Sequence, residues 1–407
     1  MATADTIIAQ PQAVKETQIA KMTGHQFWAQ YLRSIMEPLL QAVGSYTPEE
    51  QALHLQFLVD HVAPSLGPLP TEPRGQYTMT YVDAPFEPSL NLTSSGKAKV
   101  RYEFEVVKPA GGDDGPDPFG EKRAREVLPL LAKACGADTK WLNSLMDAFF
   151  LTPAETDMLR GKLPSFMPCS MMAFDLDATK TMMKVYIPGI RKAIASGSSS
   201  TNAFILNAVR KLEPFGEKLG PGLDIVADNS FAVARDVMTL GGRLTDETSL
   251  KRVEVLRSVW PLLRNEQPGQ GPDPHATAAA DRDAYDAWEK PERIAGTPFS
   301  GLQYNVELNP SKAGIETKCY IPLFQHNASA QESEASMEKV LQKLDHEWGH
   351  SGKYRQTVET VFGKDRVTPT FVSFSYSKQK GAYMSAYIPK IIENVGSEIK
   401  AGDFEYF

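Results

Sequence analysis

The sequence predicts an α+β protein in which antiparallel hairpins form a sheet closed on itself, with helices outside. Three observations support this fold class. One hairpin pattern occurs three times, a further segment alternates polar and apolar residues as strands do, and helical patterns separate the hairpins. Repeated hairpins that always alternate with helices bury one face of the sheet against those helices and leave the other face inside. We therefore expect the second face to line a lumen.

The hairpin repeat is the most informative feature. Each copy has two strand patterns around a short polar turn and ends in Tyr-Ile-Pro; the copies are residues 171–188, 302–322 and 371–389. Two copies place a lysine two residues before the tyrosine, and the third has a tyrosine at the matching position. Residues two apart on a strand share a face, so we expect these side chains to line the lumen: Lys184, Tyr186, Lys318, Tyr320 and Tyr387. The alternative is that they face solvent, as Lys-x-Tyr often does on a strand.

Other elements follow from periodicity and capping. Period-two strands are expected at 76–82 and 99–107, where Val100, Tyr102, Phe104 and Val106 alternate with Arg101, Glu103 and Glu105. Thr-Pro-x-Glu capping boxes at Thr47 and Thr152 open two helices, and apolar spacing from Phe27 indicates another. Further helices are expected at about 120–134, 138–149, 201–213, 230–238, 246–263 and 333–348, and residues 264–283 have the composition of a mobile loop.

Composition excludes several classes of protein. The net charge of −7 argues against a nucleic-acid-binding surface. Three widely spaced cysteines form no zinc or disulfide pattern, and no run of about 18 apolar residues could span a membrane. Residues 1–22 lack an apolar signal core and are expected to be a disordered tail before a single catalytic domain, 23–407. We expect a cytoplasmic enzyme, compatible with a homodimer.

Cations and phenols in a lumen suit a reaction that releases diphosphate from an allylic carbon. Lys184, Lys318 and Arg101 could neutralise the leaving group. The tyrosine faces could shield an allyl cation, and a closed lumen would keep water away from it.

Glu87 precedes the Arg101 strand in the segment Pro85–Asn91. It could accept an indole N–H and stabilise the charge that develops as the ring attacks. A single glutamate near a turn is more often solvated, and the sequence alone favours that reading.

Two literal motif matches indicate other chemistry. His346-Glu347-Trp348-Gly349-His350 matches the zinc-binding H-E-x-x-H, but no third ligand stands at the usual spacing. Asp113-Asp114-Gly115-Pro116-Asp117 matches the magnesium-binding D-D-x-x-D of helical prenyl synthases. Glycines and prolines around the second motif favour a turn over the helix that metal binding would need.

Several stretches taken together resemble the fungal indole prenyltransferases of the dimethylallyltryptophan synthase family, over nearly the whole chain. They are Val62–Pro68, Phe86–Asn91, Val100–Tyr102, Lys184–Gly189, Thr239–Arg243, Lys318–Pro322 and Phe374–Tyr376 with Tyr387. The resemblance implies a ten-stranded antiparallel barrel ringed by helices, known as the ABBA or PT-barrel fold. It also implies transfer of a dimethylallyl group from its diphosphate to a small indole acceptor, either tryptophan or a tryptophan-containing cyclic dipeptide, with no cofactor and no required metal.

The resemblance assigns roles to individual residues. Glu87 matches the glutamate that orients the indole, whereas Arg101, Lys184, Lys318 and Lys378 match diphosphate ligands. Tyr186, Tyr320 and Tyr387 match the tyrosines that shield the cation. No position matches a metal ligand. A phenolic acceptor is the alternative within this class, and a zinc hydrolase using His346 and His350 is the alternative outside it.

One segment departs from the family pattern. The family carries an Arg-x-Lys-x-Tyr strand shortly before Thr239-Leu240-Gly241-Gly242, whereas residues 220–229 here contain no Lys, Arg or Tyr. We expect either a shortened hairpin at 220–229 or the absence of that segment. Two diphosphate ligands and one shielding tyrosine would then be missing.

Overall fold

The computed structural model describes residues 23–70, 79–82, 84–94, 98–106, 115–163, 170–213, 216–227, 238, 242–263, 303–308, 315–327, 329–364 and 366–392. Within these ranges, the strands form a single curled antiparallel sheet. Its eight strands are β1 (Phe86–Thr93), β2 (Ala98–Glu105), β3 (Met171–Asp177), β4 (Lys180–Tyr186), β5 (Gln303–Leu308), β6 (Ile315–Ile321), β7 (Phe371–Ser377) and β8 (Gly381–Tyr387). The order across the sheet is β4-β3-β2-β1-β8-β7-β6-β5, so β4 and β5 are its edges.

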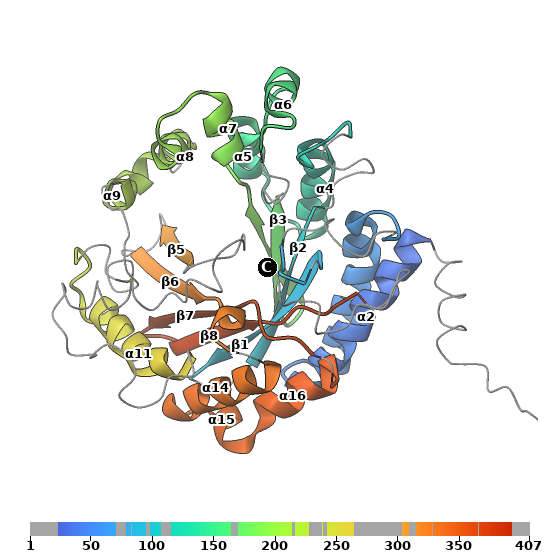
Figure 1. Ribbon diagram of the computed structural model, residues 1–407, viewed down its shortest axis with the longest axis vertical. Coiled ribbons are helices and arrows are strands. Elements are labelled where there is room, and N and C mark those ends of the chain that lie inside the picture. The colour runs from blue at the N-terminus through green and yellow to red at the C-terminus, as the bar shows by residue number, and fades with distance from the viewer. Residues whose placement is uncertain are drawn as a thin grey trace, which may run out of the picture.

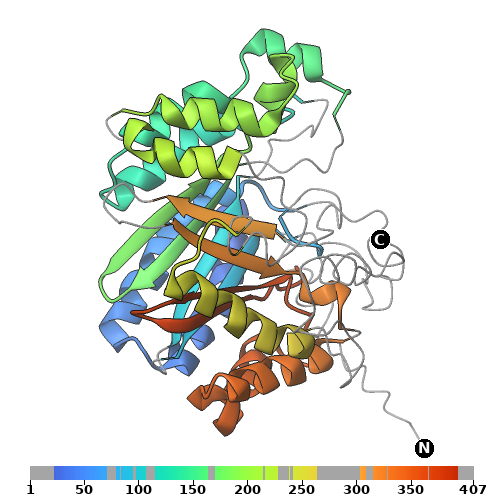
Figure 2. The ribbon, with the colours of Figure 1, turned by 90° about the vertical axis from the view of Figure 1, so that its left-hand side faces the viewer.

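The helices lie outside the curl of the sheet (Figure 1). They are α2 (Gly24–Val43), α3 (Pro48–Phe57), α4 (Glu121–Ala134), α5 (Lys140–Phe149), α6 (Pro153–Leu159), α7 (Ile190–Ala195), α8 (Thr201–Arg210), α9 (Gly216–Ala227), α11 (Glu247–Leu263), α14 (Ala330–Lys343), α15 (Glu347–Ser351) and α16 (Lys353–Phe362). In the side view the sheet lies between the green helices α7 and α8 and the orange helices α14–α16 (Figure 2).

Local sequence explains where several helices begin. Thr23, Thr47 and Thr152 each accept a hydrogen bond from the third residue of the helix that follows, and the side chain of that residue returns the bond. The reciprocal bonds satisfy backbone N–H groups that a helix start leaves unpaired. The predicted capping boxes at Thr47 and Thr152 are confirmed.

The two faces of the sheet have opposite polarity. Val100, Tyr102 and Phe104 on β2 are at most 1% exposed and point toward the helices. Tyr102 stacks on Phe174 of β3, and Phe57 of α3 packs against the same ring. The intervening residues of β2 therefore face the inside of the curl, as alternation requires. The hydrophobic core lies between sheet and helices, and the polar face of the sheet is turned inward.

Tyr46 fixes the loop after α2 to this sheet. Its hydroxyl accepts a hydrogen bond from the Val100 amide at 2.9 Å and donates one to the Leu176 carbonyl at 3.0 Å. Burial raises the pKa of this tyrosine to about 12, so the hydroxyl keeps its proton. One buried phenol thereby connects β2, β3 and the helical layer.

Three expectations need correction. Met79–Val82 forms bends and turns in place of the expected strand at 76–82, of which 76–78 lie outside the described residues. The expected hairpin at 220–229 is helical through Ala227, because its Leu and Val spacing suits a helix and it lacks strand alternation. The expected helix at 333–348 is interrupted at Leu344–His346, where Asp345 adopts a φ of 54°. Among the described residues the sheet has eight strands, and the ten-stranded barrel stays a prediction.

Other expected segments lie outside the described residues. These are 1–22, 264–283 and all of the expected helix 230–238 except Met238. Within the described part of the chain, no helix is both long and apolar enough to cross a bilayer.

We predict that Tyr46→Phe lowers the free energy of unfolding by about 1–3 kcal/mol, because it leaves the buried Val100 amide without an acceptor. The matched control is Tyr376→Phe, whose hydroxyl makes no hydrogen bond among the described residues; it should stay within about 0.5 kcal/mol of wild type. Urea denaturation followed by circular dichroism measures both. Equal stabilities for the two variants would contradict the assigned role of Tyr46.

Candidate active site

One row of residues crosses four neighbouring strands on the inner face of the sheet. Glu87 of β1 stands directly opposite Glu103 of β2, Glu103 opposite Ala173 of β3, and Ala173 opposite Lys184 of β4. Directly opposite residues in a sheet point to the same side. The row therefore brings the predicted glutamate and a predicted diphosphate ligand onto one surface.

Asp175 organises the cations beside this row. Its carboxylate accepts from Arg101 Nε at 2.9 Å and from Lys184 Nζ at 2.8 Å. Arg101 also donates a hydrogen bond to the Ser385 hydroxyl at 3.3 Å. Ser385 is on β8, so the Arg101 side chain reaches from β2 across β1. Arg101 and Lys184, which are 83 residues apart in sequence, are thus held by a single carboxylate.

Lys318 approaches the same place from the other half of the sheet. Burial lowers its pKa to about 7, and the positive charges of Arg101 and Lys184 lower it further toward that value. Its ammonium lies 5.8 Å from the Tyr320 ring centre and 5.3 Å from that of Tyr383. Lys318 thus adds a third positive charge beside the two that Asp175 pairs, and a cluster of this kind would bind an anion.

The predicted tyrosines gather at one end of the cation cluster. Tyr320 and Tyr387 have ring centres 5.9 Å apart, and Phe371 stands edge-on to Tyr320 at 6.4 Å. The phenol of Tyr186 interacts electrostatically with those of Tyr320 and Tyr387. Burial raises the pKa of Tyr320 to about 12 and raises those of Tyr186 and Tyr387, so these phenols are neutral.

Glu87 is buried within β1 and does not project into solvent. It is 1% exposed, and the Thr370 hydroxyl donates a hydrogen bond to its Oε1. The solvated reading of Glu87 is therefore wrong. Burial, the charge of Glu103 and a hydrogen bond with Glu103 all raise the pKa of Glu87 well above its ordinary value.

Glu103 belongs to the site and was not singled out from the sequence. Burial raises its pKa to about 7, while the hydrogen bond from Glu87 and the charges of Lys184 and Lys318 oppose this rise. The signal was present in the alternation of β2, because Glu103 shares a face with Arg101. Tyr383, which hydrogen-bonds Glu316 beside Lys318, was also missed. It stands four residues before Tyr387 on β8, so strand alternation places the two on the same face.

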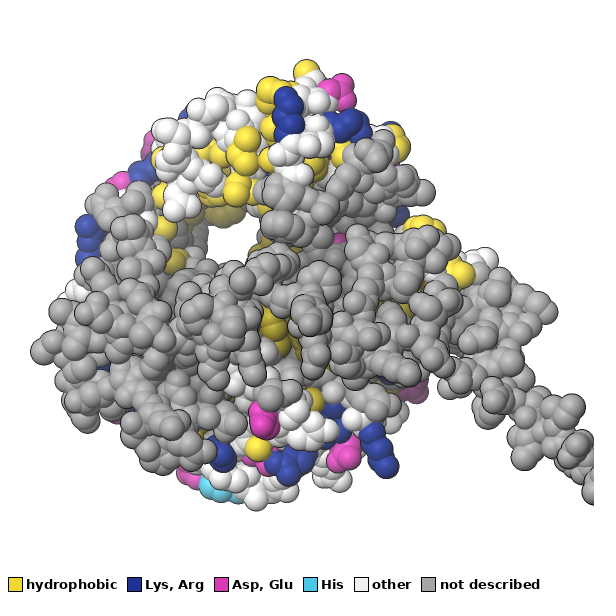
Figure 3. Space-filling model, viewed as in Figure 1, with side chains coloured by type: hydrophobic (Ala, Val, Ile, Leu, Met, Phe, Trp, Pro, Cys, Tyr) yellow, Lys and Arg dark blue, Asp and Glu magenta, His cyan; other side chains and the backbone are white. Residues whose placement is uncertain are grey.

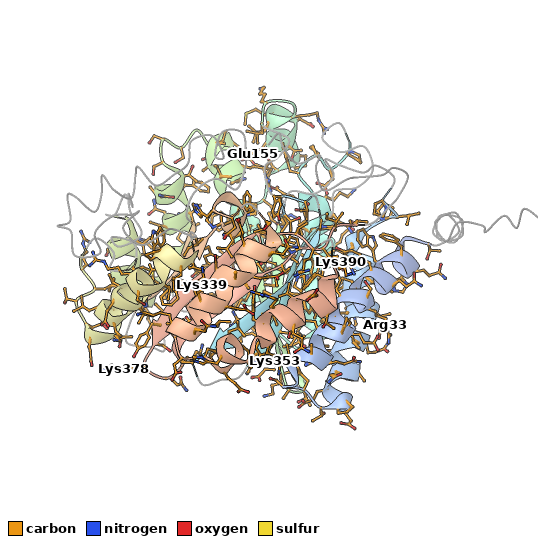
Figure 4. The ribbon with its side chains drawn as sticks, turned by 60° about the horizontal axis from the view of Figure 1, so that its bottom comes forward. Arg33, Glu155, Lys339, Lys353, Lys378 and Lys390 are labelled. Carbon is orange, nitrogen blue, oxygen red and sulfur yellow. The ribbon has the colours of Figure 1, made fainter. Side chains whose placement is uncertain are left out.

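Lys378 does not lie with the other predicted diphosphate ligands. It follows β7 in a turn, its side chain is 67% exposed, and it pairs with Glu247 of α11 at 2.6 Å. Figure 4 shows it at the periphery of the molecule, away from the inner face of the sheet.

The two competing motifs do not form the structures their chemistry requires. His346 precedes α15 as its N-cap and accepts the Trp348 amide at 3.1 Å, whereas the exposed His350 bonds Asp345. A zincin needs both histidines on one helix. In the second motif, the described residues from Gly115 onward form bends and a turn, and Asp117 accepts the backbone amides of Lys122 and Arg123. Across the described ranges, no cluster of three or more His, Cys, Asp or Glu could hold a metal ion.

The space-filling view shows an opening into the molecule (Figure 3). The hollow lies near the edge strand β5 and below the helices α8 and α9, and hydrophobic side chains border it. This is the side on which β4 and β5 end the sheet without pairing to one another.

The sequence is similar to those of known proteins over most of its length. The sequence model of the tryptophan dimethylallyltransferase family matches residues 24–228 and 225–357. Indole prenyltransferase tdiB of Emericella nidulans is 43% identical over 423 residues, which cover 94% of this chain and 99% of that protein. The two parts of the family match meet at 225–228, where the chain lacks the Arg-x-Lys-x-Tyr pattern.

Solved structures share the fold. The crystal structure of AnaPT from Neosartorya fischeri has a TM-score of 0.68 at 21% identity and covers 94% of this chain and 96% of its own. NotF in complex with brevianamide F and DMSPP also has a TM-score of 0.68, at 18% identity, covering 95% of this chain and 97% of its own.

The inward cations and tyrosines, the curled sheet with helices outside, and a match spanning most of the sequence lead to one assignment: the chain belongs to the tryptophan dimethylallyltransferase family of prenyltransferases.

Proposed function

We propose that this enzyme transfers a dimethylallyl group from dimethylallyl diphosphate to the ring of an indole acceptor. The observation that carries the proposal is the convergence of Arg101, Lys184 and Lys318 beside neutral tyrosines, on the face that also presents Glu87. The name of tdiB and the ligands of NotF support the indole acceptor and the dimethylallyl donor.

The proposed reaction is electrophilic aromatic substitution. The bond between the allylic carbon and the diphosphate oxygen breaks, and its electron pair leaves with the diphosphate toward the three cations. The indole ring then forms a carbon–carbon bond to the allyl cation and loses a ring proton to recover its aromaticity. Tyr186, Tyr320 and Tyr387 present polarisable faces that stabilise the cation, since an aromatic face attracts positive charge.

Glu87 acts on the acceptor in this proposal. An indole N–H becomes more acidic as positive charge develops on the ring, so its hydrogen bond to a carboxylate strengthens in the transition state. Interactions that strengthen in this way raise the rate more than they raise the affinity.

We further propose that no metal is required. Arg101, Lys184 and Lys318 would supply the counter-charge that Mg²⁺ supplies to diphosphates elsewhere. The similarity in fold to solved prenyltransferases also supports the proposal that the curled sheet corresponds to a ten-stranded barrel in the family. The thiols of Cys135 and Cys319 are unpaired, which supports a reducing, cytoplasmic location.

The first prediction concerns the leaving-group site. Lys184→Ala should weaken binding of inorganic pyrophosphate by about 1.5–3 kcal/mol, the contribution of a hydrogen bond to a charged group. Lys99→Ala is the matched control, because Lys99 makes a similar cross-strand ion pair with Asp177 at the neighbouring same-face position, where the two side chains are 49% and 66% exposed. Isothermal titration calorimetry measures both. Equal losses for the two variants would contradict a local diphosphate site.

The second prediction concerns pH. Burial lowers the pKa of Lys318 to about 7, and a bound anion would favour the charged form of this lysine. Above that pH, binding must take up a proton, so pyrophosphate affinity should fall by up to about tenfold per pH unit. In Lys318→Arg the guanidinium stays charged over this pH range. Pyrophosphate itself titrates in both experiments, so the difference between the two pH profiles of affinity reports the titration of Lys318 alone. Parallel pH profiles would show that Lys318 does not titrate at the site.

The third prediction concerns Glu87. Glu87→Gln keeps the shape of the side chain and removes its charge, and turnover with an indole acceptor should fall about 10²-fold or more. KM for the acceptor should change much less, because the interaction strengthens mainly in the transition state. Circular dichroism checks the fold. Near-normal turnover would refute this role and favour a phenolic acceptor.

The fourth prediction concerns metals. Prenyl transfer should persist in excess EDTA, measured by product formation with dimethylallyl diphosphate and a panel of indoles. Loss of activity in EDTA, with recovery on adding Mg²⁺ or Zn²⁺, would refute metal independence.

A further inference from the structure

Glu87 and Glu103 form a hydrogen-bonded pair of carboxyl groups inside the sheet. They occupy directly opposite positions on β1 and β2, and their side chains are hydrogen-bonded to each other. Two ionised carboxylates repel and have no proton to donate, so a hydrogen bond between them requires that one carries a proton. The pair therefore binds a shared proton.

The two ends of the pair have different surroundings. Around Glu87 lie the Thr370 hydroxyl, which donates to it, and the buried phenol of Tyr81. Around Glu103 lie the cations Lys184 and Lys318. Only Ala173 lies between Glu103 and Lys184 in the row across the strands. Its methyl group is too small to separate the two charges, which interact electrostatically.

Further charged and titratable groups face Glu103 from the surrounding strands. The phenols that interact with it are Tyr186, Tyr320 and Tyr387, from β4, β6 and β8. All three are neutral, and the cation of Arg101 on β2 is paired with Asp175 on β3. With the site empty, the net field of Lys184 and Lys318 holds negative charge on Glu103, and the shared proton resides on Glu87.

This placement conflicts with the role of Glu87 in the proposed reaction. A protonated Glu87 donates its proton to Glu103 and lacks the carboxylate charge that an indole N–H would bind. Something must remove the proton from Glu87 before the acceptor can be held. A diphosphate bound to Lys184 and Lys318 would do so, because it neutralises the charges that keep Glu103 ionised.

We propose that diphosphate binding moves the shared proton from Glu87 to Glu103, so that Glu103 is a positioning residue that prepares Glu87 to receive the acceptor only after the donor is bound. The O–H bond of Glu87 breaks, an O–H bond of Glu103 forms, and no other bond changes. The inference rests on the proposed function. It makes donor and acceptor binding cooperative, and the cooperativity depends on the acceptor N–H.

The test measures the affinity of 3-methylindole by calorimetry, with and without saturating inorganic pyrophosphate. This probe is neutral, so it has no direct charge interaction with the anion. We expect pyrophosphate to tighten its binding by at least about fivefold, the lower range of an allosteric coupling. The same factor should appear in pyrophosphate affinity when 3-methylindole is saturating, because the coupling is reciprocal.

Two comparisons assign the effect to the carboxyl pair. Glu103→Gln cannot accept the proton, so its affinity for 3-methylindole should not respond to pyrophosphate. Glu105→Gln, two residues further along β2 on the same face, should retain the response. With the wild-type enzyme, 1,3-dimethylindole has no N–H and should show no coupling, which tests the proposal without any variant.

The outcomes separate the inference from the proposed function. Failure of pyrophosphate or of 3-methylindole to bind the wild-type enzyme would overturn the proposed function itself. Binding of both without coupling would overturn only the role of Glu103. Full coupling in Glu103→Gln, or with 1,3-dimethylindole, would also overturn it, because the coupling would then not pass through the shared proton or the N–H.

Discussion

The inner face of the sheet depends on the repulsion among Arg101, Lys184 and Lys318 and on the carboxylates beside them. Asp175 holds Arg101 and Lys184 together, but Lys318 lies within their field without a matching ion pair at the same point. Buried charges are costly unless they are paired. Burial and the neighbouring positive charges lower the pKa of Lys318, and the negative charge of a bound diphosphate would raise it again. The charges of the site therefore favour the binding of an anion.

The sheet tolerates charged residues on its inner face because its apolar residues point outward, toward the helices. Residues such as Val100, Tyr102 and Phe104 supply a continuous core against the helices, so folding does not depend on an apolar interior within the curl. The inner face is consequently open to polar residues from many strands. Because the strands are antiparallel and in register, residues far apart in sequence stand in one row, as Glu87, Glu103 and Lys184 do.

The donor and acceptor regions share this row, which links their electrostatics. Glu87 at one end is raised in pKa by burial and by its neighbour Glu103, while Glu103 is influenced by the cations at the other end. Any ligand that changes the charge at the cations must change the balance of protons at the carboxyl pair. Tyrosines between these regions remain neutral and can contact a cation without competing for protons. Helix α9 spans Gly216–Ala227 and so takes up most of the segment 220–229, where a hairpin was expected.

Local patterns were enough to predict an antiparallel sheet with helices outside it, the three hairpins and the same-face pairs of Lys and Tyr, because alternation and capping do not depend on the tertiary arrangement. The sequence also indicated the missing pattern near 220–229. It could not decide whether the polar face of a strand meets solvent or a lumen, since alternation is identical in both cases. Only the curl of the sheet decided that, and it buried Glu87 and brought Glu103 beside it. Tertiary structure also placed Lys378 on the outer surface and ended a helix before His346. Such outcomes depend on register and on contacts between distant segments, neither of which a local pattern specifies.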